Sequence, residues 1–158
     1  MTGREIIAKW TGETAMDLVS NYQRLGLKAS GQWSRDLETR IEEKGTKYTI
    51  TFLGSKYTEQ LILGRRPNKN QNKEAIRKFV GWAGSTFLAD WVKNKGLKIS
   101  PFAVAYKIAR EGIQVPNANN PGTILSNVFS EDRINELLKT LSMSIVTEVR
   151  SDIKKVFA

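Results

Sequence analysis

Carboxylates are the side chains in this sequence that could perform acid–base chemistry, because the 158-residue chain contains neither histidine nor cysteine. Histidine is the usual general base and the commonest metal ligand, and the cysteine thiolate is a common protein nucleophile. Asp36 and Glu38 alternate along a predicted strand, which would place them about 7 Å apart on one face, and Glu42–Glu43 follow at its end. Because Arg35 and Arg40 are their neighbours, we interpret this set as solvated surface.

A second acidic pair, Glu131–Asp132, opens the last predicted helix, where negative charge complements the helix macrodipole. Aspartate and glutamate nowhere reach the local density that a two-metal nuclease site requires. Gly81 and Gly84 are not followed by the Lys-Ser or Lys-Thr pair of a phosphate-binding loop. The sequence therefore predicts no catalytic residue, no metal site and no cofactor, and it predicts that the protein is not an enzyme.

The net charge of +9 is concentrated in the middle of the chain. Residues 1–54 hold eight basic and seven acidic side chains, and residues 111–158 hold five and six, whereas residues 55–110 hold twelve and three. A localised positive field attracts polyanions or an acidic protein surface, and a merely solvated surface is the alternative. The candidate interface or DNA-channel residues of this region are Arg65, Arg66, Lys69, Lys73, Arg77 and Lys78.

A basic loop, residues 64–73, lies between two apolar segments of this middle region and reads "GRRPNKNQNK". Almost none of its side chains suits a hydrophobic core, and Pro67 stiffens it. We expect Arg65 and Arg66 to be exposed and directed away from the core. Two partners remain open, another protein or the phosphates of nucleic acid, because the planar guanidinium group binds carboxylate and phosphate alike.

Hydrophobic periodicity predicts an α+β fold in a single domain, residues 1–158. Thr2 and Glu5 have the spacing of a capping box at the start of an N-terminal amphipathic helix. Alternating side chains then predict an antiparallel β-hairpin near residues 32–53, with Trp33 on its inward face and a turn at "EKGT". We expect Trp33 and Phe52 to pack against the first helix or the last.

Short helices and one long helix complete the predicted fold. Residues 55–64 predict a short helix with Ser55 as its N-cap, a third strand being the alternative, and residues 73–95 predict one helix or two. Pro101 opens a helix with a small-residue face. Residues 113–127 predict a loop too polar to bury, and residues 130–156 a long helix with one apolar stripe, formed by Ile134, Leu138, Leu141, Ile145, Val149 and Ile153.

The tryptophans and the apolar segments bear on partners as well as on the core. Trp10, Trp82 and Trp91 lie on or near apolar helix faces, so we expect them, like Trp33, to pack in the core rather than to stack on bases. No stretch approaches the roughly 20 apolar residues that span a bilayer. We therefore expect no membrane contact.

The order of these motifs resembles that of the tail-completion, or neck, proteins of tailed bacteriophages. The segments "YTEQLILGRRPNKN" and "FLADWVKNKGLKISPFAVAYKIAREGI" carry the resemblance, and "LKASGQWSRDLE" and "YTITFLGSKY" resemble the hairpin of that family. The matching positions are Gly64–Pro67, Trp91, Lys95–Leu97 and Phe102–Ile113. Between Asn72 and Trp91 the chain differs from the family pattern, because "GWAGSTF" lengthens the usual short link.

The resemblance implies a structural protein of the virion, placed at the head–tail junction and assembled in the cytoplasm of a host bacterium. Such proteins form homo-oligomeric rings that join the portal or connector to the tail and surround the DNA channel. Arg65 and Arg66 would then contact a neighbouring subunit or ring, or line the channel. A non-enzymatic DNA-binding protein with a basic central face is the alternative, and only the ring protein predicts a closed oligomer without strong affinity for free duplex DNA.

Overall fold

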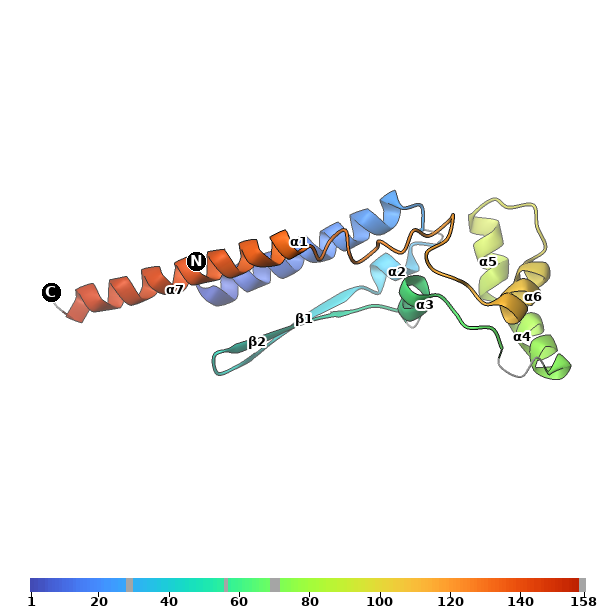
Figure 1. Ribbon diagram of the computed structural model, residues 1–158, viewed down its shortest axis with the longest axis horizontal. Helices are drawn as coiled ribbons and strands as arrows, with labels where there is room; N and C mark the ends of the chain where they lie inside the picture. Colours follow the sequence, from blue (N-terminus) through green and yellow to red (C-terminus); the bar gives the residue numbers. More distant parts are fainter. Residues whose placement is uncertain (28–29, 56, 69–71, 157–158) are drawn as a thin grey trace. The chain divides into compact units, whose positions relative to one another are not determined.

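The computed structural model describes residues 1–27, 30–55, 57–68 and 72–156, and it confirms the α+β class. In these residues a two-stranded antiparallel sheet accompanies helices at both ends of the chain and between them (Figure 1). The elements are α1 (Gly3–Arg24), α2 (Gln32–Arg35), β1 (Glu38–Lys44), β2 (Lys47–Leu53), α3 (Thr58–Leu63), α4 (Lys73–Ser85), α5 (Phe87–Asn94), α6 (Pro101–Glu111) and α7 (Glu131–Val156). None of the helices in the described ranges is both long and apolar enough to cross a membrane.

The chain divides into two compact units. Unit 1 contains Met1–Asn21, Glu38–Leu53 and Ile124–Ala158, so it holds most of α1, the hairpin and α7. Unit 2 contains Tyr22–Leu37 and Gly54–Thr123, so it holds the last turn of α1 and helices α2 to α6.

The first helix begins as the sequence predicts. The Glu5 N–H donates to Thr2 Oγ1 at 3.3 Å, and the Thr2 N–H donates to Glu5 Oε2 at 2.8 Å, which completes the capping box. Along the helix, Ile6 and Leu18 are buried within unit 1, as the apolar stripe predicts.

The hairpin is shorter than its predicted span. Ile41 pairs with Ile50 and Thr39 with Phe52, and the turn follows Lys44 as predicted. Trp33 is not on a strand, which corrects the sequence prediction: it lies in the single turn of α2. The segment before Glu38 is too short for its period to distinguish a strand from a single helical turn, and only the residues from Glu38 onward pair across the hairpin.

Unit 1 places α7 antiparallel to α1. Ser144 Oγ donates to the Met1 carbonyl at 2.8 Å, and Arg133 reaches Asp17 of α1, so positions that rise along one helix fall along the other. Phe52 of the hairpin contacts Phe129, just before α7, edge to face with ring centroids 5.4 Å apart. Beyond residue 144, α7 continues past the start of α1 (Figure 1).

Trp33 is the largest fully buried side chain of unit 2. Its ring lies 4.6 Å from that of Tyr22, and its Nε1 donates to Thr58 Oγ1 at 3.0 Å. The hydroxyl groups of Tyr22 and Tyr57 are 3.3 Å apart. Because burying an indole without a hydrogen-bond acceptor is costly, α3 is tied to α2 through this donor.

The short helix α3 confirms the predicted helix over its alternative, a third strand. Tyr57 occupies its N-cap position, which corrects the prediction of Ser55. Ser55 Oγ has no hydrogen-bond partner among the described residues, and the Ser55 carbonyl accepts from the Thr58 N–H at 2.9 Å. Residues 73–95 form two helices, since the chain leaves the helical conformation at Thr86.

Helices α4, α5 and α6 share a small core. Ala83, Leu88 and Ala105 are buried together, and partly buried apolar side chains pack around them. A Cβ added at Gly84 of α4 would collide with the Phe102 ring of α6. The predicted small-residue face therefore does bring another helix close.

The loop of residues 113–127 is more buried than its polarity predicts. Asn120 is buried and its Nδ2 donates to the Leu61 carbonyl at 2.7 Å within unit 2. Ile124 is fully buried in unit 1, where its carbonyl accepts from Asn21 Nδ2 at 3.0 Å. Side-chain amides satisfy backbone carbonyls here, which allows a polar loop to enter the fold.

Candidate interaction surfaces

Arg65 belongs to the fold of unit 2, which corrects the prediction that it projects from the core. Its backbone N–H donates to the Ile113 carbonyl at 2.8 Å, and the Ile113 N–H donates back at 2.7 Å. Its guanidinium lies 4.0 Å from the centre of the Phe79 ring and donates to Asn68 Oδ1 at 3.2 Å. Burial lowers the pKa of Arg65, although an arginine stays charged at neutral pH.

Two glycines make this bridge possible. Gly64 has φ +79° and ψ −162°, and Gly112 has φ +74° and ψ −164°, a conformation that essentially only glycine adopts. A Cβ at Gly64 would also collide with the Ile113 carbonyl, and one at Gly112 with the Arg65 carbonyl. The motifs "GRRP" and "AREGI" thus meet at one backbone bridge.

The other five basic candidates differ in their surroundings. Arg66 is exposed, as predicted, and Lys69 lies outside the described residues. Lys78 pairs with Glu74 one turn earlier, Nζ to Oε1 2.9 Å, an exposed pair that contributes about 0.3–0.5 kcal/mol. Lys73 and Arg77, one turn apart on α4, have no carboxylate within ion-pair distance in the described part of the chain.

A groove of about 480 Å³ lies beside these two cations, between α4 and α6. Ile76 and Val80 contribute aliphatic surface, and Gly81 leaves part of the α4 side without a side chain. Phe102 and Tyr106 of α6 complete the lining and remain 47% and 50% exposed. Two adjacent aromatic rings left half in solvent, above aliphatic side chains, are typical of a binding surface.

Sequence reasoning placed Lys73 and Arg77 among the candidates but missed the groove. Phe102 and Tyr106 are one turn apart on α6, a spacing that could have indicated a shared edge. The α4 side could not be assigned without knowing that α4 pairs with α6.

A second exposed apolar surface follows α7 in unit 1. Ile134, Leu138, Ile145 and Val149 are 41%, 55%, 57% and 51% exposed. With Leu141 they are separated by four, three, four and four residues, so they lie on one side of the helix. We call these five residues the α7 stripe.

Trp82 also differs from its prediction. It is 60% exposed, and its ring contacts Phe79 and Phe87 at centroid distances of 6.2 and 5.3 Å. The next residue on α4, Ala83, is fully buried, whereas Trp82 is on the exposed part of the helix surface, so an apolar residue beside a core position did not itself enter the core.

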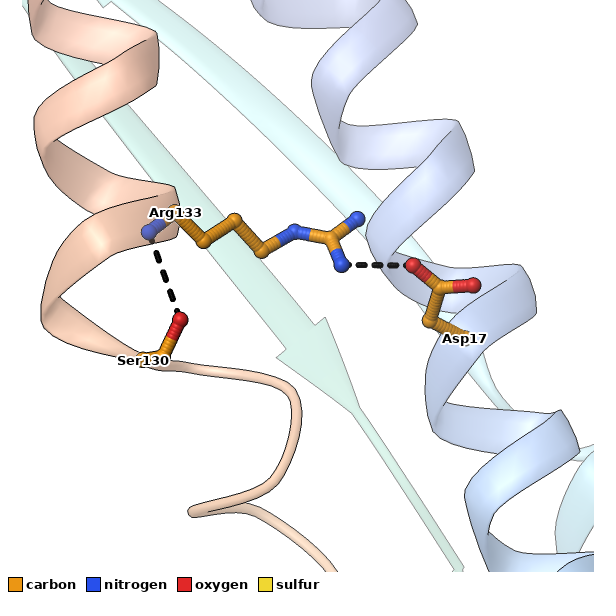
Figure 2. Close-up of polar contacts among 3 residues, drawn as sticks. All are labelled: Asp17, Ser130 and Arg133. Carbon is orange, nitrogen blue, oxygen red and sulfur yellow. Dashed lines mark hydrogen bonds and ion pairs between the residues drawn. The ribbon is translucent and has the colours of Figure 1, made fainter.

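A further cavity, of about 630 Å³, lies between α1 and the start of α7. Figure 2 shows the contact beside it: Arg133 Nη1 donates to Asp17 Oδ2 at 2.5 Å, and the Arg133 N–H donates to Ser130 Oγ at 3.3 Å. The same guanidinium lies 5.9 Å from the centre of the Trp10 ring. These contacts hold α7 to α1, and we assign them a structural role.

No group of three or more His, Cys, Asp or Glu side chains that could hold a metal ion occurs among the described residues. Comparison of the chain with protein-family models, with curated proteins and with solved structures gave no significant match. The surfaces themselves therefore carry the functional argument.

Proposed function

We propose that this protein is a ring-forming structural component of a phage head–tail junction, and that its copies join through the α7 stripe. The exposed stripe is the observation that carries the proposal. The resemblance at Gly64–Pro67, Trp91, Lys95–Leu97 and Phe102–Ile113 supports the location in the virion.

The stripe suits contact with another copy because its members form one continuous apolar row. Isolated exposed apolar residues are ordinary on protein surfaces, whereas a contiguous row marks an interface. Spacings of four and three residues are those of side chains that insert between residues of a facing helix. The end of α7 beyond Ser144 has no α1 beside it, which leaves the last two members of the row, Ile145 and Val149, open to a second chain.

The test is the mass of the purified full chain in solution, by light scattering or native mass spectrometry. We expect a closed oligomer of defined mass for the natural chain and a monomer for the double variant Leu138→Gln/Ile145→Gln. Met143→Gln is the matched control, because Met143 is 62% exposed but faces away from the stripe. A monomeric natural chain, or a double variant with unchanged mass, would refute assembly through α7.

The position in the virion is tested with the same variant. Particles produced with the Leu138→Gln/Ile145→Gln chain should show DNA-filled heads that lack joined tails when they are imaged by electron microscopy. Normal numbers of joined particles would contradict the head–tail role.

A DNA-binding protein is the second candidate, and the charge of unit 2 favours it. That unit holds fifteen basic and five acidic side chains. Anisotropy of a labelled duplex at several salt concentrations separates the two functions: the ring protein predicts weak binding, and the alternative predicts tight binding by a monomer or dimer that weakens steeply as salt increases.

A further inference from the structure

The groove between α4 and α6 has an apolar lining beside two basic side chains. Ile76 and Val80 supply aliphatic carbon, and Phe102 and Tyr106 supply two aromatic rings. Its α4 side runs from Lys73 to Gly81, a distance of eight residue steps, or about 12 Å of helix. That length matches two turns of a helix lying in the groove, which is a common mode of peptide recognition.

The charged side chains beside the groove indicate which type of partner helix would bind there. Lys73 and Arg77 line the groove and form no ion pair with a carboxylate in the described residues. On the α6 side, the Arg110 guanidinium lies 5.7 Å from the centre of the Tyr106 ring, so a third cation is close to the lining. Carboxylates beside the apolar residues of a partner would find cations on both sides of this groove.

Gly81 adds an independent observation. Gly84, three residues later, has a reason within the chain, because a side chain there would collide with Phe102. At Gly81 an added Cβ would meet nothing within 4 Å, although glycine in the middle of a helix is unfavourable. Gly12 of α1 is equally open but lines no described groove, so it offers a matched control.

We infer that this groove binds an acidic amphipathic helix of a partner protein. A second copy is disfavoured, because unit 2 holds fifteen basic and five acidic side chains and would repel another unit 2. The nearly balanced unit 1, with ten basic and eleven acidic side chains, would offer these cations little net attraction. Nucleic acid is disfavoured by the aliphatic part of the lining, which offers phosphates no donor. The inference does not depend on the ring, because the groove lies wholly within unit 2 and the α7 stripe within unit 1.

The experiment uses fluorescein-labelled 15-residue helical peptides and the full chain, with binding followed by anisotropy. The peptides carry Leu or Phe at positions spaced by three and four, with Glu on both flanks, and matched peptides carry Lys in place of Glu. We expect the acidic peptides to bind at least tenfold more tightly than the basic ones, and to bind more weakly at high salt. No binding of any acidic peptide up to 1 mM, which is roughly −4 kcal/mol, would overturn the inference.

Three variants locate the site. Lys73→Glu/Arg77→Glu should lose at least tenfold in acidic-peptide affinity, and Gly81→Leu should lose as much by filling the groove. Gly12→Leu should bind like the natural chain. The Leu138→Gln/Ile145→Gln variant should also bind normally, so a failure of the ring proposal would not remove the peptide site. Equal peptide binding by all variants would place the contact elsewhere and overturn the inference.

The same variants test two other possible occupants of the groove, single-stranded DNA and a second copy of the chain. If a labelled dT12 oligonucleotide binds more tightly than the acidic peptides, and Gly81→Leu weakens its binding, the groove binds nucleic acid. The inference would then be replaced by base stacking on Phe102 and Tyr106. An oligomer that Gly81→Leu alone dissociates would replace it with a second copy.

Discussion

Unit 1 and unit 2 of this chain differ most in charge. Unit 1 holds ten basic and eleven acidic side chains, whereas unit 2 holds fifteen and five. The net charge of the whole protein therefore describes neither unit. An apolar contact between like copies suits the nearly neutral unit, and an acidic partner suits the basic one.

The two units also differ in how their tryptophans and their exposed apolar side chains are arranged. In unit 2, Trp33 is buried with its indole hydrogen-bonded, and Gly84 brings α6 against α4. In unit 1, Trp10 Nε1 and Thr14 Oγ1 are buried without a hydrogen-bond partner among the described residues, and the α7 stripe lies in solvent. Unit 2 thus satisfies its buried indole, although it leaves Ser55 Oγ unpaired among the described residues and Phe102 and Tyr106 half exposed. Unit 1 leaves an indole N–H unpaired and a continuous apolar row exposed.

The largest expected effect compares one aromatic residue from each unit. Trp33→Ala should destabilise the protein by about 3–5 kcal/mol, because it removes a buried indole and its hydrogen bond. Phe52→Ala should cost roughly half as much, because Phe52 is only partly buried and meets Phe129 at one edge. Urea unfolding measures both, with the exposed Trp82→Ala as a control expected to cost below about 1 kcal/mol. Equal costs for Trp33→Ala and Phe52→Ala would show that Phe52 of unit 1 is packed as completely as Trp33 of unit 2.

The next effect compares glycines. Gly112→Ala should cost about 2–4 kcal/mol, because alanine rarely adopts this backbone conformation and its Cβ would displace the Arg65 carbonyl. Gly81→Ala and Gly12→Ala, in open helical positions, should each be neutral or stabilise by up to about 1 kcal/mol. Thermal unfolding of the three variants decides the matter, and a harmless Gly112→Ala would mean that the bridge between Arg65 and Ile113 is dispensable.

Much of the fold follows from local sequence signals, because these act within a few residues. Three features could be predicted without knowledge of distant contacts: the capping box at Thr2, Pro101 at the start of α6 and the long apolar period of α7. Trp33 was misassigned because its partners Tyr22 and Thr58 are distant in sequence and decide its environment.

The candidate site was predictable only in part for the same reason. Lys73 and Arg77 were identified as candidates from the concentration of basic side chains in the middle of the chain, which can be read directly from the sequence. Arg65 was expected in solvent, yet Phe79 and Ile113, 14 and 48 residues away, hold it in the fold. The groove exists because α4 and α6 lie side by side, and no local sequence pattern predicts that pairing.

The smallest expected effect concerns alkaline pH and the tyrosines of the two units. Burial, and then the hydroxyl of Tyr22, raise the pKa of Tyr57 in unit 2 above its ordinary value near 10. The unfolded chain then loses this proton at a lower pH than the folded chain. The contribution of Tyr57 to stability is therefore complete below about pH 10 and decreases as the pH rises further.

Tyr57→Phe removes this ionisation and leaves the lysines unchanged. Between pH 9 and 11, we expect the free energy of unfolding of the natural chain to fall more steeply than that of Tyr57→Phe. In unit 1, the hydroxyl of Tyr48 donates to Glu43 at 3.0 Å. This hydrogen bond is the largest of the causes that raise the pKa of Tyr48. That tyrosine is at the solvent-exposed surface of the hairpin, where water screens its interaction, so Tyr48→Phe should keep a slope closer to that of the natural chain. Parallel curves for the natural chain and Tyr57→Phe would show that the Tyr57 hydroxyl ionises equally in both states, and would remove this difference between the units.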